Sequence, residues 1–366
     1  MLSKRLIPAV LSVALVLSAC GGSGGSSATT SPTTTASAPP AAASPSTSSG
    51  SSAPLATSAT NPFPASSAQS TIFAAVNSYR NQVGVGELVD DPILDTAATA
   101  HATYLQANLE NGNLGGALTH DEVPTFTDFY ADSPLDRARK AGTPATEFIG
   151  EDVAASAQTP PVAGGTDCVS RLLDSVYHLT GSTDTEQTLG IGFTPVTGSI
   201  SATCVLDFGS TTGVSGTPQA NAIPVFGGQQ MATNAIAHVP VANETDVALA
   251  MVAESPNPTP SITSPGRPLM IRVNAASAGD VLTVSSFTVT DSSGNPVAGE
   301  ILIPSGAVTG STSAAVVDAN ALLPPGVVFF IPAQPLVANT VYTASFLGAR
   351  DGTPISSSWS FTTAAD

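Results

Sequence analysis

The sequence predicts an α+β protein in which a helix-and-sheet domain precedes an all-β sandwich. Three observations predict this class. Residues 20–68 are almost all Ser, Thr, Ala, Gly and Pro, a composition that does not form a packed core. Within residues 69–212, apolar side chains recur at the spacing of helices. From residue 265 onward, short alternating runs rich in Val, Thr and Ser lie between turn residues, as in a β-sandwich.

Residues 1–19 have the plan of a signal peptide. A short basic region precedes an apolar run from Leu6 to Ala19, and this run is shorter than the roughly 20 residues of a spanning helix. The residues Leu-Ser-Ala before Cys20 resemble the lipobox of bacterial lipoproteins. The resemblance implies a lipid on Cys20 as membrane anchor and an extracytoplasmic place in the cell envelope, at the surface or in the periplasm. An ordinary secretory signal and a transmembrane anchor are the alternatives.

Residues 20–68 are predicted to be a disordered tether, because they offer almost no large apolar side chains to bury. About 300 residues remain after the tether, which is enough for two domains of ordinary size. Residues 213–264 include the proline-rich stretch 256–260 and are predicted to be a linker or extension. The second domain is expected over residues 265–366.

The mature chain is expected to be acidic and sparsely charged. The full sequence has 27 acidic and 10 basic residues, and two of the basic residues, Lys4 and Arg5, lie in the predicted signal peptide. This balance argues against nucleic acid and against anionic membrane surfaces as electrostatic partners.

Two cysteines, Cys168 and Cys204, remain once Cys20 is lipidated. In an oxidising compartment such a pair is most simply a disulfide, and two buried free thiols are the alternative. A disulfide would tie the helix before His178 to the second strand after it.

The first domain is predicted to layer helices on a small sheet. Asp91 is a typical N-cap, Pro92 suits the first helical position, and Gly84 and Gly142 are typical helix ends. The predicted elements are helices over 71–82, from 91 through 109, from 133 to 142 and over 167–179, and strands over 188–193 and 200–208.

The second domain is predicted to be all-β. Trp359 and Phe361 alternate with Ser360, so both should point into the core of the sandwich. Residues 332–342 and 358–363 resemble two strands of bacterial immunoglobulin-like domains, which implies a spacer or adhesion module. The predicted strands are 269–273, 281–290, 327–331, 342–347 and 358–363, with turns at 293–296 and 351–352.

Several short motifs in residues 69–212 occur in the order and spacing of one family. The chain resembles the CAP superfamily of cysteine-rich secretory, antigen-five and pathogenesis-related proteins, and most closely its bacterial secreted branch. Where this family usually has Asn after the motif glutamate, the chain has Asp152, which adds a charge. The matching motifs are Asn77–Arg80, Leu88–Leu94, Ala98–Leu105, Thr119-His120, Gly150-Glu151-Asp152, Tyr177-His178 and Gly190–Phe193.

The resemblance implies an α-β-α sandwich with His120, Glu151 and His178 in a cleft above the sheet. Some members of the family bind a divalent metal there, and two imidazoles with one carboxylate suit zinc or another divalent cation with one position open to water. Without metal, a hydrogen-bonded histidine–glutamate cluster is the alternative. Asp174 and Glu122 are the candidates for the second acidic residue of the cleft.

Other polar residues are predicted to have structural roles. His101 lies on the apolar stripe of its helix and is expected to be a packed core residue. His238 is expected at the surface. Arg137, Arg139 and Lys140 lie near a helix end, where positive charge suits the helix dipole.

Three functions are hypotheses at this point. The first is a non-catalytic surface protein whose CAP-type domain binds a lipid, a cell-wall or matrix component, or a host ligand. The second is a metal-assisted hydrolase, in which His120, Glu151 and His178 hold a cation that lowers the pKa of bound water. The third is a structural adhesin that makes its contacts through the β-sandwich. No catalytic nucleophile is recognisable, which favours the first.

Overall fold

The first half of the described chain is built around a four-stranded sheet. A computed structural model describes residues 52–224, 226–277 and 279–365. The sheet has the order β1-β3-β4-β2, in which β1 runs parallel to β3 and the other pairs are antiparallel. The strands are β1 (Val89–Asp90), β2 (Phe148–Ser156), β3 (Thr188–Thr194) and β4 (Ala202–Ser210).

The predicted signal peptide, the lipidation site Cys20 and residues 20–51 of the predicted tether lie outside the described residues. Within the described ranges, the helices are all too short or too polar to cross a membrane. The later part of the predicted tether, residues 52–67, is described and contacts the first domain. Ala53 N–H donates to Gly228 O over 2.8 Å, and Ala59 N–H donates to the Glu87 carboxylate over 2.8 Å.

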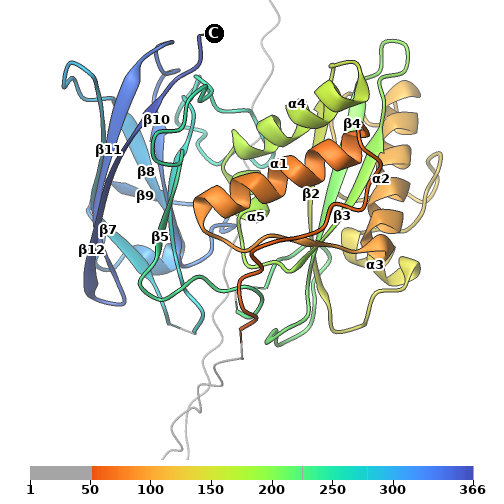
Figure 1. Ribbon diagram of the computed structural model, residues 1–366, viewed down its shortest axis with the longest axis horizontal. Coiled ribbons are helices and arrows are strands. Elements are labelled where there is room, and N and C mark those ends of the chain that lie inside the picture. Colours follow the sequence, from red (N-terminus) through yellow and green to blue (C-terminus); the bar gives the residue numbers. More distant parts are fainter. Residues whose placement is uncertain (1–51, 225, 278, 366) are drawn as a thin grey trace, which may run out of the picture. The chain divides into compact units, whose positions relative to one another are not determined.

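Helices cover both faces of this sheet (Figure 1). On one face lie α1 (Ala68–Val83) and α4 (Pro161–Leu173), which pack on Leu189, Leu206 and Phe208. On the other face lie α2 (Pro92–Glu110) and α3 (Pro134–Ala141).

The α2 helix lies very close to β3 because two residues of that strand lack side chains. A Cβ atom on Gly190 would lie 2.2 Å from the backbone of Leu94, and one on Gly192 would lie 2.0 Å from the backbone of Ala98. These glycines therefore fix the distance between helix and sheet. The predicted helix start at Asp91 and Pro92 is confirmed, since Asp91 caps α2 and accepts from the Ile93 amide.

The helix predicted over 167–179 is wrong in its bounds. It begins earlier, as α4 at Pro161, and stops at Leu173; a separate short helix, α5 (Tyr177–Ser182), follows. The helix is interrupted between α4 and α5 because the amides of Val176 and Tyr177 donate to the Glu254 carboxylate, over 2.7 and 3.0 Å, and not to carbonyls of α4.

The strand β2 was not predicted at all. Nearly all of its nine residues are buried, because helices cover both faces of the sheet. Such a strand lacks the alternation of polar and apolar residues by which strands are predicted from sequence.

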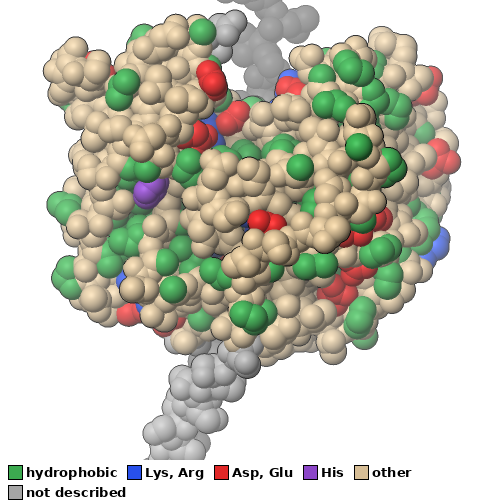
Figure 2. All heavy atoms as spheres, in the orientation of Figure 1, with side chains coloured by type: hydrophobic (Ala, Val, Ile, Leu, Met, Phe, Trp, Pro, Cys, Tyr) green, Lys and Arg blue, Asp and Glu red, His purple; other side chains and the backbone are tan. Residues whose placement is uncertain are grey.

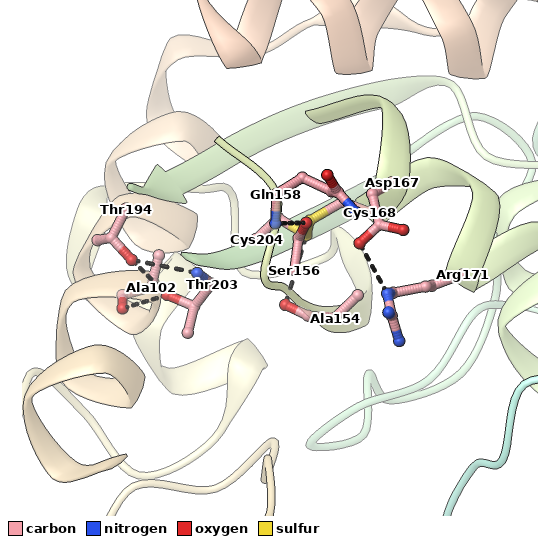
Figure 3. Close-up of a disulfide and its surroundings, with 10 residues drawn as sticks. All are labelled: Ala102, Ala154, Ser156, Gln158, Asp167, Cys168, Arg171, Thr194, Thr203 and Cys204. Carbon is pink, nitrogen blue, oxygen red and sulfur yellow. Dashed lines mark hydrogen bonds and ion pairs between the residues drawn. A yellow bond between two sulfur atoms is a disulfide. The ribbon is translucent and has the colours of Figure 1, made fainter. Parts of the chain in front are cut away.

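The disulfide between Cys168 and Cys204 is confirmed (Figure 3). It joins α4 to β4 across the face that α1 and α4 cover, and both cysteines are fully buried. The crosslink closes a loop with a sequence separation of 36 residues, for which a stabilisation of about 2–4 kcal/mol is typical.

The second half of the chain is a β-sandwich. Its two sheets have the orders β5-β6-β10-β8-β9 and β12-β11-β7, and their facing side chains form one core. Trp359 and Phe361 lie in that core, as predicted, with exposed fractions of 4% and 1%. The strands are β5 (Ile236–Val239), β6 (Leu269–Val273), β7 (Leu282–Asp291), β8 (Gly299–Ile303), β9 (Ala315–Val317), β10 (Val327–Pro332), β11 (Val341–Arg350) and β12 (Thr353–Thr362).

Strand β5 comes from the segment that was predicted to be a linker. It pairs with β6, so this segment supplies one strand of the sandwich. His238 on β5 is half-buried and stacks on Trp359 with a centroid distance of 4.4 Å. The prediction that His238 lies at the surface is therefore wrong, because the edge strand carrying it was missed.

The α/β part and the sandwich belong to one compact unit. Two buried arginines of the sandwich pair with acidic residues of the first part. Arg272 Nη1 lies 2.7 Å from Asp184 Oδ1, and Arg267 Nε lies 2.6 Å from Asp174 Oδ1. These ion pairs fix the sandwich against the end of α4 and the loop after α5.

Candidate functional site

A cavity of about 470 Å³ lies at the free edge of β2, between the α/β part and a loop of the sandwich. The segment 220–224 runs beside this edge, where Ala222 N–H donates to Ile149 O and Asn221 Oδ1 accepts from the Glu151 amide. On the sandwich side, residues 321–325 of the loop between β9 and β10 line the cavity. Its volume is in the range of small-molecule sites in proteins.

The cavity brings together all three residues predicted to share a cleft. His120, Glu151 and His178 line it, although they lie in a loop, in β2 and in α5. Asp152 and Glu254 line it as well. Glu254 was not predicted as a cleft residue, because it lies in the segment predicted to be a linker.

Glu151 is held by three basic groups. Its Oε1 lies 2.8 Å from His120 Nδ1 and 3.8 Å from His101 Nε2, and its Oε2 accepts from Arg137 Nη2 over 2.6 Å. Burial by itself raises the pKa of this carboxyl, but His101, Arg137 and His120 outweigh burial and hold the pKa at about 2. Glu151 is therefore a firmly ionised anchor.

A second layer of buried polar residues lies behind Glu151. His101 is buried, as predicted, but it is also part of this layer: its Nδ1 lies 2.9 Å from Glu122 Oε1, and its Nε2 donates to the Thr119 carbonyl oxygen over 2.8 Å. Glu122 also accepts from the Tyr130 amide over 2.6 Å. Neither candidate for the second acidic residue of the cleft lines the cavity: Glu122 lies behind Glu151 against His101, and Asp174 pairs with Arg267.

Arg137 was predicted to serve the dipole of its helix, and this prediction is wrong. Its side chain is fully buried and lies between Glu151 and Glu122, 2.6 and 3.8 Å away. Opposite Glu151 on β4 lies Asp207, also fully buried. Burial, together with the nearby Glu151 charge, raises the pKa of Asp207 well above its usual value.

Asp152 follows Glu151 on β2 and points to the opposite face of the sheet, toward α5. Its Oδ2 accepts from Ser182 Oγ over 2.8 Å. Burial raises the pKa of Asp152 to about 6, and the nearby His178 and His120 offset this only in part. Two adjacent carboxyls at one cavity thus have pKa values on opposite sides of their ordinary range.

His178 shares its Nδ1 between two acceptors. Glu254 Oε2 lies 3.0 Å away and Ser175 Oγ lies 3.1 Å away, while the Ser175 hydroxyl donates to Leu172 O over 2.9 Å. Although burial lowers the pKa of His178, its bonds and charges with Glu254 and Asp152 raise it overall. Ser175 therefore receives a hydrogen bond from the imidazole and is not placed as a nucleophile, whose hydroxyl would donate to the imidazole.

A link between the two parts of the chain closes one side of the cavity. Tyr177 donates from its hydroxyl to Asp318 Oδ1 over 2.5 Å and accepts from Asn320 Nδ2 over 2.8 Å. Tyr177 comes from α5, and its two partners come from the loop after β9. The sandwich therefore contributes directly to the wall of the cavity.

The predicted metal ligands do not fit a three-ligand site in this arrangement. Both Glu151 oxygens are engaged, and the Arg137 guanidinium lies where it would repel a cation. In the part of the chain that the structure describes, no group of three or more His, Cys, Asp or Glu side chains is close enough to hold a metal ion. Metal binding at this site stays a prediction from sequence.

No protein-family model matches this chain, and no curated protein matches it either. The resemblances to CAP and immunoglobulin-like domains therefore remain predictions. The cavity and the charges around it are the observations on which a functional proposal has to rest.

Proposed function

We propose that this chain is an exported lipoprotein that binds an extracytoplasmic ligand in the cavity beside β2. The first part is then a CAP-type domain, and the sandwich is an immunoglobulin-like domain that completes the wall of the cavity. The observation that carries the proposal is the convergence of His120, Glu151 and His178, distant in sequence, on one cavity.

The lining of the cavity supports ligand binding. The lining combines ionisable groups, among them Asp152, His178 and Glu254, with apolar residues of three segments. Mostly apolar walls with a few polar groups are typical of small-molecule sites. The apolar residues are Ile223, Pro224, Pro256, Leu322, Leu323, Pro324 and Pro325.

The same contacts give less support to hydrolysis. Glu151 is engaged by Arg137 and His120 and is not available as a general base. Ser175 is oriented as an acceptor toward His178. Metal-assisted hydrolysis and adhesion through the sandwich remain the alternatives, and neither has an observation in its favour that binding lacks.

Filling the cavity tests the proposal. We expect n-octanol, a neutral amphiphile, to bind the wild-type mature chain in calorimetric titration. Ala222→Trp places an indole on the cavity wall and should abolish binding. Ala220→Trp is the matched control, because Ala220 is exposed, lies two residues away and does not line the cavity. Failure of both octanol and charged amphiphiles of the same chain length to bind, or persistence of octanol binding in Ala222→Trp, would contradict the proposal.

The anchor is tested separately. Cys20→Ser should abolish acylation and move the protein from the membrane to the soluble fraction, because the proposed lipid is the anchor. The measurement is metabolic lipid labelling with fractionation, and Cys168→Ser serves as the control that keeps the label. A Cys20→Ser protein that still carries lipid would refute the anchor.

A further inference from the structure

The charges that line the cavity are unbalanced. Four carboxylates line it, those of Glu151, Asp152, Asp184 and Glu254, together with the imidazoles of His120 and His178. Among the described lining residues there is no lysine or arginine. The negative charge of these carboxylates must therefore be balanced by basic side chains outside the lining of the cavity, or by a bound ligand.

Two of the four carboxylates pair with buried arginines that do not line the cavity. Arg137 pairs with Glu151 at 2.6 Å, and Arg272 pairs with Asp184 at 2.7 Å. Both arginine side chains are buried. A third carboxylate, Glu254, accepts from the amides at the start of α5 and pairs with His178.

Asp152 is the carboxylate that lacks such a partner. It is 6% exposed, and the only side chain among the described residues that donates to it is Ser182, a neutral hydroxyl bound to Oδ2. Its Oδ1 is not fully enclosed by protein atoms. This oxygen lies 3.2 Å from the position that a Cβ on Gly181 would take. Gly181 lines the cavity, so the absence of a side chain there leaves Oδ1 open to a bound molecule.

We infer that the cavity selects ligands with a primary ammonium group, which binds between Asp152 and Glu254 while a short apolar body packs on residues 321–325. This inference rests on the proposed ligand binding and names the class of ligand. An ammonium group has three donors and needs acceptors at hydrogen-bond distance. Unlike a metal ion, it does not need three ligands converging within about 2 Å.

The burial of Asp152 agrees with a cationic ligand. Burial raises the pKa of Asp152 to about 6 because the ionised form lacks compensation. A bound ammonium would supply that compensation.

Three probes with the same eight-carbon chain test the inference: n-octylammonium, n-octanol and octanoate. Titration calorimetry on the mature chain at pH 7 should give the tightest binding for octylammonium, by about tenfold over octanol, and the weakest for octanoate. Asp152→Asn keeps the shape and the acceptor for Ser182 but removes the charge. It should abolish the preference for octylammonium while octanol binding stays unchanged.

The control is Asp167→Asn, which removes a charge from the surface of α4, where Asp167 pairs with Arg171 outside the cavity. It should keep the wild-type preference. Equal binding of octylammonium and octanol, or tighter binding of octanoate, would overturn the inference and leave the proposed binding function intact. Persistence of the preference in Asp152→Asn would overturn the role of Asp152. Failure of all three probes to bind would overturn both proposals.

Discussion

Glu151 and Asp152 are neighbours on one strand, and the protein treats them in opposite ways. Side chains alternate across β2, so Glu151 faces α2 and α3 whereas Asp152 faces α5. The pKa of Glu151 is about 2 and that of Asp152 is about 6. The layer on each face, and not the type of residue, decides which carboxylate is a structural anchor and which needs a partner.

The difference comes from what each helical layer supplies. On one face, α2 brings His101 and α3 brings Arg137 to Glu151. On the other face, α5 brings the hydroxyl of Ser182 to Asp152, and the imidazole of His178, which lowers the pKa of Asp152, is shared with Glu254. Adjacent carboxyls with divergent pKa values are a common feature of functional sites. Acidic side chains are also more widespread than basic ones on the face shown in Figure 2, so cations are scarce and their placement matters.

The largest effect should come from removing the cation beside Glu151. Arg137→Met would leave Glu151 and Glu122 buried without their guanidinium and should cost about 3–5 kcal/mol of unfolding free energy. Urea denaturation at pH 7 measures it. The same change at Arg171, which forms an exposed pair with Asp167, should cost less than about 0.5 kcal/mol. Equal costs for the two variants would show that Arg137 does not anchor the cluster.

Glu151→Gln should also destabilise the protein at pH 7, by about 3 kcal/mol, since its pKa lies below the ordinary 4.5 at about 2. A lowered pKa means that the contribution is present above pH 4.5 and is lost as the pH falls toward about 2. The difference between wild type and Glu151→Gln, measured by urea denaturation across this range, should therefore shrink with acid. A difference that stays constant with pH would contradict the ionised anchor.

Asp152→Asn should stabilise the protein at pH 7, whereas Glu151→Gln should destabilise it. Because the pKa of Asp152 is raised from 3.8 to about 6, its ionised form destabilises the ligand-free fold, and the variant should gain about 1–3 kcal/mol at pH 7. Because the pKa of this carboxyl is raised, the wild type should be less stable than the variant above about pH 6. This difference in stability should disappear as the pH falls toward 3.8. Thermal and urea unfolding at pH 7 and pH 4 measure this. Destabilisation by Asp152→Asn at pH 7 would contradict the contrast with Glu151.

Zinc should have the smallest effect. Micromolar Zn²⁺ is expected to raise the melting temperature by less than about 1 °C, because Arg137 engages Glu151 and leaves two imidazoles as the remaining predicted ligands. His120→Ala and His178→Ala are the matched variants. A rise of several degrees that disappears in both variants would establish the metal site that the family resemblance implies.

The sequence alone determined features that depend on near neighbours in the chain. Asp91 and Pro92 start a helix, and Gly84 ends one, because caps act on amides and carbonyls within a single turn. Trp359 and Phe361 point inward because alternation along one strand suffices to predict it. The Cys168–Cys204 pair followed from counting cysteines.

Only the tertiary structure decided the electrostatics of the site. The buried strand β2 carries no alternation, so the opposite orientations of Glu151 and Asp152 could not be derived from the sequence. Glu254 comes from a segment without a regular pattern, and its carboxylate meets α5 from 76 to 78 positions away in the chain. Charges act through space, and the sign of a pKa shift depends on partners that the fold brings together from distant segments.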